Sequence, residues 1–163
     1  MTETPRRRLA ANALLRNQRG EILLVQPTYR ADDLWLLVGG TVDEDEAPLR
    51  ACRREVREEL GIDVPLRQLL CVEYQPRTAR GPASLHFLFD GGVLTEAQVA
   101  QLRLPAGELG AWEFVEEGAA RRRVGPRVGR RLEVALMALQ QRRTIYLEDG
   151  VVTGAWPEAS QEE

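Results

Sequence analysis

The sequence predicts an α/β fold in which helices cover a mixed β-sheet, and two observations lead to this prediction. Short apolar or alternating runs, which are typical of strands, recur along most of the chain. Two longer segments, residues 47–60 and 127–139, instead repeat apolar residues at three- and four-residue steps. That spacing is the period of an amphipathic helix, so each segment is expected to pack one face on the sheet.

The first part of the chain predicts three strands. They are expected over residues 9–15, 21–26 and 34–38, separated by a turn at 17–20 and a loop at 27–33. These short connections favour a start that is rich in hairpins.

The first helix is expected to follow these strands and to end at Gly61, because glycine readily adopts the left-handed conformation that closes a helix. Its apolar positions share one face. They are Leu49, Cys52, Val56 and Leu60.

The rest of the chain predicts further strands, the second helix and a closing hairpin. The strands are expected over residues 66–74, 84–89 and 112–115, with a loop at 75–82. The helix over residues 127–139 follows Gly125-Pro126, and a hairpin over 144–152 is expected to turn at Asp149-Gly150.

Length and composition favour one soluble domain. A chain of 163 residues can bury a core without disulfides, so we expect a single domain over residues 1–163, with a loose tail from about residue 154 to 163. Its 22 basic and 25 acidic residues give a net charge of −3, which argues against wrapping a nucleic acid. Cys52 and Cys71 form no metal or redox pattern and favour a cytoplasmic setting, and no apolar stretch predicts a membrane span.

Three carboxylates cluster on the first predicted helix. At about 100° per residue, Glu55, Glu58 and Glu59 share a face that differs from the apolar one. Neighbouring carboxylates repel, so a cation such as Mg²⁺ would stabilise the cluster. The preceding Gly39-Gly40 could add a backbone carbonyl, because no Cβ blocks approach. The alternative is a solvated helix face held by pairs such as Arg54 with Glu58.

The spacing around this helix distinguishes the two interpretations. The pattern is Gly, five residues, Glu, seven residues, Arg-Glu, an aliphatic, any residue, Glu-Glu, any residue, Gly and an aliphatic. It is filled by Gly40, Glu46, Arg54, Glu55, Val56, Glu58, Glu59, Gly61 and Ile62. Residues 40–62 therefore resemble the complete box of the Nudix hydrolase family.

The resemblance implies an α/β/α sandwich with a mixed central sheet and a hydrolase that needs Mg²⁺, with Mn²⁺ as the alternative ion. Such an enzyme cleaves a diphosphate bond in a nucleoside diphosphate linked to another group. The substrates in the family include nucleoside triphosphates, ADP-ribose and sugar nucleotides, and homodimers are frequent.

The same resemblance assigns roles to individual residues. The implied metal ligands are Glu55, Glu58, Glu59 and the Gly39 carbonyl, with Glu108 as a further candidate ahead of the strand that holds Trp112. One glutamate could instead act as the general base. The resemblance makes Arg54 and Glu46 a buried pair that orients the helix, and Gly40 and Gly61 structural positions. Val38 replaces the family's usual proline, which bears on loop rigidity.

Other residues are weaker candidates. Tyr29 and Arg30 could bind a base and a phosphate, with Gly40 beside them, and Arg77 could meet a distal phosphate; the alternative for Tyr29, Arg30 and Arg77 is a plain surface loop. His86 favours a structural role in an apolar run. The arginine clusters at 121–123 and 130–131 favour either an acidic partner or solvated helix ends.

Two other functions stay open. Nudix folds also serve as ligand sensors without hydrolytic activity, but sensors typically lose box glutamates, and all of them are present here. An isomerase of isopentenyl diphosphate would need a catalytic cysteine, which Cys52 and Cys71 do not supply in a recognisable setting.

Overall fold

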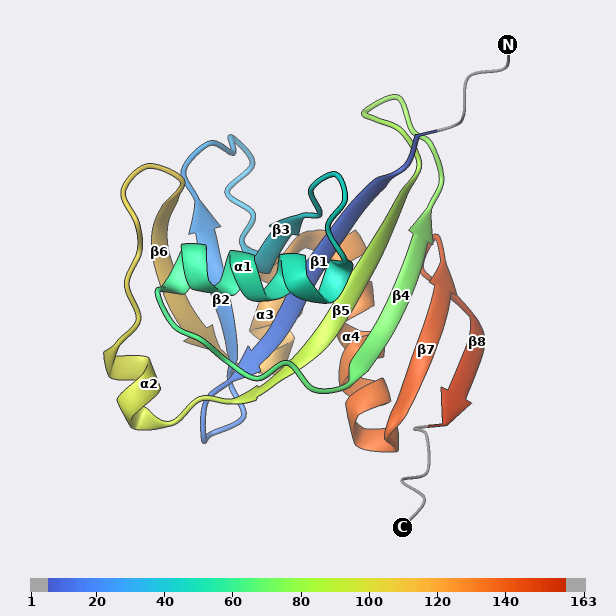
Figure 1. Cartoon of the computed structure of the whole chain (residues 1–163). Helices are drawn as coiled ribbons and strands as arrows, with labels where there is room; N and C mark the ends of the chain where they lie inside the picture. The colour runs from blue at the N-terminus through green and yellow to red at the C-terminus, as the bar shows by residue number, and fades with distance from the viewer. Residues whose placement is uncertain (1–5, 158–163) are drawn as a thin grey trace.

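A single eight-stranded sheet organises the protein. The computed structural model describes residues 6–157, and its strands lie in the order β6-β2-β3-β1-β5-β4-β7-β8 (Figure 1). The strands are β1 (Arg8–Arg16), β2 (Ile22–Pro27), β3 (Leu36–Thr41), β4 (Leu69–Gln75), β5 (Ser84–Val93), β6 (Leu109–Val115), β7 (Arg143–Glu148) and β8 (Val151–Pro157). The helices are α1 (Pro48–Leu60), α2 (Glu96–Ala100), α3 (Glu117–Arg123) and α4 (Gly125–Gln141). The pairings β1–β5 and β4–β7 are parallel and the others antiparallel, so the mixed sheet is confirmed.

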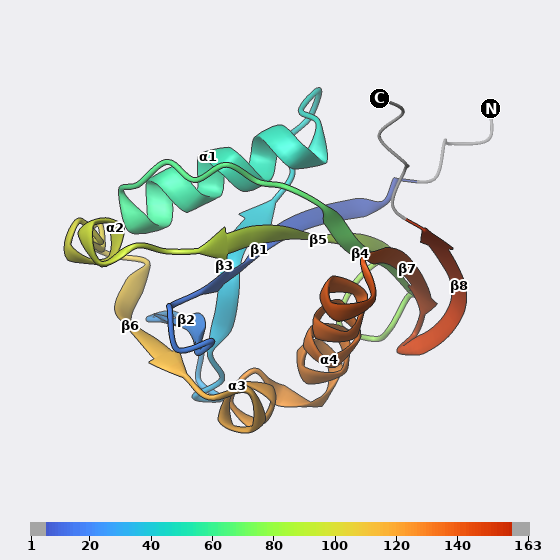
Figure 2. The same cartoon turned by 90° about the horizontal axis from the view of Figure 1, so that it is seen from below.

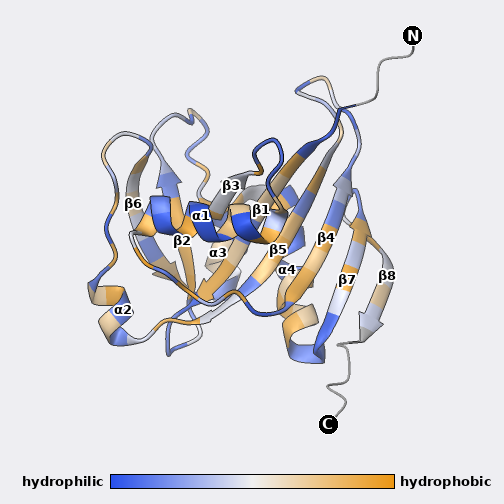
Figure 3. Ribbon diagram, in the orientation of Figure 1, coloured by the Kyte–Doolittle hydropathy of each residue, from blue (hydrophilic) through white to orange (hydrophobic). Residues whose placement is uncertain are grey.

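Helices cover both faces of the sheet, which gives the three layers of a sandwich. Figure 2 shows α1 on one side of the strands and α3 and α4 on the other. Successive residues of β1 point to opposite faces, so Ala11 and Leu15 belong to the core under α1, whereas Leu14 belongs to the core under α4. The stripes of α1 in Figure 3 match this arrangement, because the apolar side chains Cys52, Val56 and Leu60 are buried against the sheet.

The helix that carries the acidic cluster is confirmed almost residue for residue. Ala47 caps its start, and Gly61 ends it with a left-handed φ of 70°, donating its N–H to the Arg57 carbonyl. The predicted turn at Asp149-Gly150 is confirmed as well, since both residues have positive φ between β7 and β8.

Three expectations differ from the structure. The sequence ends the third strand at Val38 and makes Gly39-Gly40 a loop, but β3 continues through both glycines, which pair with Asn12 and Ala11. Helices α2 and α3 were not predicted, because segments of five and seven residues are too short to show a helical period. The expected tail from residue 154 is wrong up to Pro157, because these residues pair with β7; residues 158–163 lie outside the described part.

None of the helices within residues 6–157 is long and apolar enough to cross a membrane. Cys52 and Cys71 are both free and buried, which agrees with a place in the core for Cys52.

Candidate active site

Two consecutive glycines bring β3 against the acidic face of α1. The Gly39 N–H donates a hydrogen bond to Oε2 of Glu59 over 2.8 Å. Gly39 has a φ of 134°, and a Cβ there would lie 2.3 Å from the Ala11 carbonyl oxygen. A Cβ on Gly40 would lie 2.6 Å from the carboxyl carbon of Glu55. Both positions therefore require glycine, one for the backbone and one to make room for a carboxylate.

Arg54 holds the acidic residues of the box together. Its guanidinium donates to both carboxylate oxygens of Glu46, over 3.0 and 2.9 Å. The remaining nitrogen, Nη1, donates to Glu55 over 2.9 Å and to Glu58 over 3.1 Å. The Arg54–Glu46 pair is bidentate, but the side chains are 28% and 17% exposed, so the pair is only partly buried. It joins the loop before α1 to the middle of the helix.

Burial makes Glu59 the most perturbed carboxyl of the cluster. Desolvation, opposed by the Gly39 hydrogen bond and reinforced by the charges of Glu55, Glu108 and Glu58, raises the pKa of Glu59 to about 8. Burial also raises the pKa of Glu55, against the effect of Arg54. The cluster therefore carries negative charge that is incompletely compensated, as expected of a cation site.

We expect the pH dependence of stability to show this lack of compensation in metal-free protein. Glu59 keeps its proton in the folded state up to about pH 8. In the unfolded chain a glutamate loses its proton near pH 4.3. Between that pH and pH 8, the free energy of unfolding therefore falls by up to about 1.4 kcal/mol per pH unit because of this group. The measurement is urea unfolding in EDTA of wild type and Glu59→Gln.

The wild type should lose stability relative to Glu59→Gln from about pH 4.5 to pH 8, the latter being the pKa of folded Glu59. Mg²⁺ at pH 8 should restore stability to the wild type only, because the ion replaces the proton. Parallel profiles for the two proteins would contradict the assignment.

The side chains around Glu59 fit a hard divalent cation. Glu55, Glu58, Glu59 and Glu108 line one cavity of about 280 Å³, so the structure brings Glu108 from the loop before β6 to the box. Carboxylate oxygens are the ligands that Mg²⁺ prefers, and Gly39 leaves backbone accessible beside them. In the described residues no three such side chains already converge on one point, because Arg54 draws Glu55 and Glu58 toward itself. Water molecules in the coordination shell of Mg²⁺ could complete such a set.

A larger cavity of about 540 Å³ opens beside these carboxylates. Its wall includes three of the predicted substrate contacts, Tyr29, Arg30 and Gly40, together with the box glutamates Glu55 and Glu59. Arg30 is held by Asp32, to which its Nε donates over 2.8 Å. Arg77 is exposed and does not line this cavity, so it is the least supported of the proposed substrate contacts.

The sequence did not single out several residues that line the same cavity. Arg8, Asn12 and Arg131 contribute to its wall together with His86. Arg131 was grouped with Arg130 as a surface cluster, but it is 4% exposed, so the surface interpretation is wrong for this residue. His86 bonds Ser84 over 2.9 Å, which agrees with a structural role. The period of α4 could have found Arg131, because it lies four residues before Ala135 and seven before Ala138, both of which are buried.

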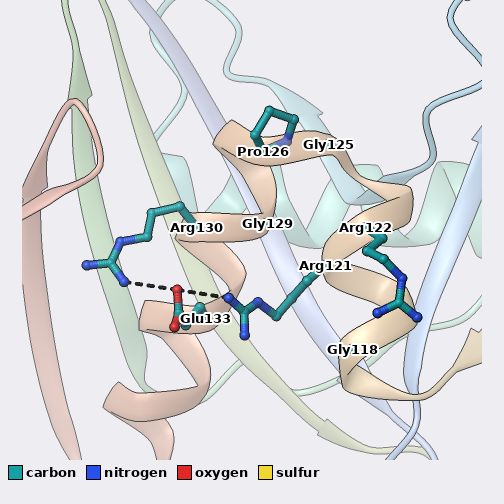
Figure 4. Close-up of a pocket in the computed structure, with 8 residues that line it drawn as sticks. All are labelled: Gly118, Arg121, Arg122, Gly125, Pro126, Gly129, Arg130 and Glu133. Atoms are coloured by element: carbon teal, nitrogen blue, oxygen red, sulfur yellow. Dashed lines mark hydrogen bonds and ion pairs between the residues drawn. The ribbon is translucent and has the colours of Figure 1, made fainter.

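A third cavity, of about 640 Å³, lies between α3 and α4 and has a different chemistry. Figure 4 shows Glu133 between Arg121 and Arg130. Its Oε2 lies 3.2 Å from Nη2 of Arg121 and 2.9 Å from Nη1 of Arg130. These ion pairs neutralise part of the arginine cluster, and the cavity has no group of carboxylates. The acidic site is therefore the better candidate for catalysis.

The chain belongs to the Nudix hydrolase family. The family model for the NUDIX domain matches residues 6–132, which contain the carboxylate cluster, the paired glycines and the buried Arg131. The fold is also that of a MutT protein from Methanosarcina mazei Go1, with a TM-score of 0.66 and 23% identity over 86% of this chain and 97% of that one.

Curated relatives match over shorter segments. An 8-oxo-dGDP phosphatase (NUDT18) of Danio rerio is 43% identical over 70 residues, which are 42% of this chain and 22% of that protein. A CTP pyrophosphohydrolase of Escherichia coli (strain K12) is 48% identical over 46 residues, 27% of this chain and 34% of that protein. The matches thus span about a fifth to a third of these relatives.

Proposed function

We propose that the protein is a Mg²⁺-dependent hydrolase that cleaves a diphosphate bond in a nucleoside diphosphate linked to another group. The observation that carries the proposal is Glu59, which is partly buried beside Glu55 and Glu108 and accepts a hydrogen bond from the Gly39 N–H. The names of the relatives, which act on different nucleotides, support the substrate class without selecting a member of it.

Some residues of the site would bind the cation, and others would position those ligands or contact the substrate. Glu55, Glu58, Glu59 and the Gly39 carbonyl would hold Mg²⁺, with Glu108 beside them; Mn²⁺ could replace it. When bound, the ion would neutralise charge on the diphosphate and lower the pKa of water. Arg54 positions Glu55 and Glu58, and a glutamate that is not engaged by the ion would accept the proton of the attacking water. Tyr29, Arg30 and Gly40 line the adjacent space for the rest of the substrate.

A sensor without hydrolytic activity is the second candidate, but no described feature favours it. All four acidic residues of the box are present: Glu46, Glu55 and Glu58 accept hydrogen bonds from Arg54, and Glu59 accepts one from the Gly39 N–H.

The test is product release from nucleoside triphosphates, ADP-ribose, sugar nucleotides and dinucleoside polyphosphates, each with Mg²⁺ and with EDTA. The proposal expects at least one of these compounds to be cleaved at a diphosphate bond with Mg²⁺ only. Binding and thermal stabilisation by a compound that is never cleaved would support the sensor instead.

A further inference from the structure

The cavity of about 540 Å³ that Tyr29 and Arg30 line has a second end, away from the carboxylates. Thr41 of β3 pairs with Ala10 of β1, Ala10 with His86 of β5, and His86 with Glu73 of β4. This row spans three strand spacings of about 4.8 Å, or roughly 14 Å in all. Ala10 leaves space on the sheet between β3 and β5, so a ligand that begins at the metal site can extend toward His86 and Arg131.

Arg131 reaches this end from α4 as a buried and positioned side chain. It is only 5% exposed, and its Nε donates to Oε2 of Glu73 over 2.6 Å. Glu73 is fixed in turn, because its other oxygen accepts the Gly150 N–H over 2.9 Å. The direction of the guanidinium is therefore set by an ion pair between α4 and β4.

The terminal nitrogens of Arg131 have no partner among residues 6–157. A guanidinium has five N–H donors, and Glu73 accepts only the one on Nε. Arg16 Nε is the only fully buried side-chain polar atom of the described residues that lacks a hydrogen bond, so the terminal nitrogens of Arg131 reach open space. Arg131 lines the cavity of about 540 Å³, so its terminal nitrogens open into that cavity. Four donors thus remain for a ligand.

Charge and shape favour a neutral group at this end. Glu73 compensates the charge of Arg131. Burial, followed by the charges of Arg131, Arg8 and Arg127, lowers the pKa of His86 to about 3, so His86 adds no charge at neutral pH. Val128, which lies on α4 three residues before Arg131, supplies an apolar wall beside it. Because Glu73 neutralises Arg131, this end of the cavity offers little net positive charge to a phosphate. An uncharged base needs no such charge.

We propose that Arg131 reads the base of the substrate by donating two parallel hydrogen bonds to a pair of adjacent acceptors. This inference rests on the proposed function and names its substrate class. Guanine offers such a pair at O6 and N7, and cytosine at O2 and N3. Adenine has a donor beside each ring acceptor of its Watson–Crick and major-groove edges, and uracil has N–H between its carbonyls. Guanine or cytosine nucleotides are therefore the preferred substrates.

The test compares kcat/KM of the wild type for GTP, CTP, ATP and UTP with Mg²⁺. The proposal expects GTP or CTP to exceed ATP and UTP by roughly 5- to 150-fold, the range for one bidentate contact. Two comparisons identify the base: 7-deaza-GTP, which lacks the N7 acceptor, should lose the advantage of GTP if guanine is read, and UTP should lack that of CTP if cytosine is read. These comparisons need no variant.

Arg131→Lys is the matching variant, because lysine keeps the charge near Glu73 but lacks the planar fork. It should reduce the preference for the favoured base below the roughly 5-fold that is the lower limit for one bidentate contact. Arg130→Lys, an exposed change on the same helix, should keep the preference.

Three results would overturn the inference. Equal cleavage of all four nucleotides would overturn it, and so would a base preference that survives Arg131→Lys. Both results would leave the proposed function intact. The absence of cleavage for every nucleotide, in the four-base comparison and in the wider panel, would overturn the proposed function and this inference with it.

Discussion

Glu59→Gln should reduce kcat by about 10²- to 10⁴-fold, the range for loss of a general base, while leaving the fold intact. Glutamine keeps the size of the side chain and an oxygen that can accept the Gly39 N–H. It removes the negative charge that a cation needs, and it cannot accept a proton as a base. The loss should therefore appear in activity and in Mg²⁺ binding rather than in unfolding at acidic pH.

The measurement is steady-state turnover of the best substrate, with Mg²⁺ affinity from calorimetry. Glu96→Gln is the matched control, since Glu96 is an exposed carboxylate at the start of α2 and lines neither of the cavities beside the box. Wild-type turnover by Glu59→Gln would show that Glu59 has no part in catalysis.

Gly40→Ala should lower kcat/KM by about 10²-fold, the order expected when a reacting geometry moves by 1 Å. The new Cβ would meet the Glu55 carboxylate at 2.6 to 2.8 Å, so this carboxylate must move away from β3. Gly40 has no positive φ, so alanine fits its backbone and the stability should fall much less than the activity.

Turnover and urea unfolding measured on the same preparation separate the two effects. Gly81→Ala is the control, because a Cβ at Gly81 meets nothing within 4 Å. Gly39→Ala is expected to behave differently, since its Cβ would strike the backbone of β1 and destabilise the sheet itself. Unchanged turnover in Gly40→Ala would show that the position of Glu55 does not matter for catalysis.

The part of the site that lies on one helix could be predicted from sequence, because local periodicity determines it. Glu55, Glu58 and Glu59 share a face in any helix that begins near Pro48 and ends at Gly61. The apolar positions of the same helix decide which face is buried, and Cys52 and Val56 are buried as expected. The alternation of strand and helix signals predicted a mixed sheet with helices, and the resemblance to the Nudix family implied the sandwich.

The rest depends on contacts between residues that are far apart in the sequence. Gly39 and Gly40 predicted a loop, and only pairing with β1 shows that they form the end of β3. Arg131 appeared to belong to a basic surface, but Glu73, 58 residues away, makes its burial possible. Such a pairing depends on the position of α4 over β4, which the sequence alone did not determine.

The most direct test of the central claim is hydrolysis of the best substrate in water enriched in oxygen-18, followed by ³¹P NMR, with Mg²⁺ and with EDTA. We expect one product to carry a single labelled oxygen on the phosphorus that water attacked, and no product in EDTA. A substrate that binds but stays intact with Mg²⁺, or that is cleaved equally well in EDTA, would contradict metal-dependent diphosphate hydrolysis at the Glu55–Glu59 cluster.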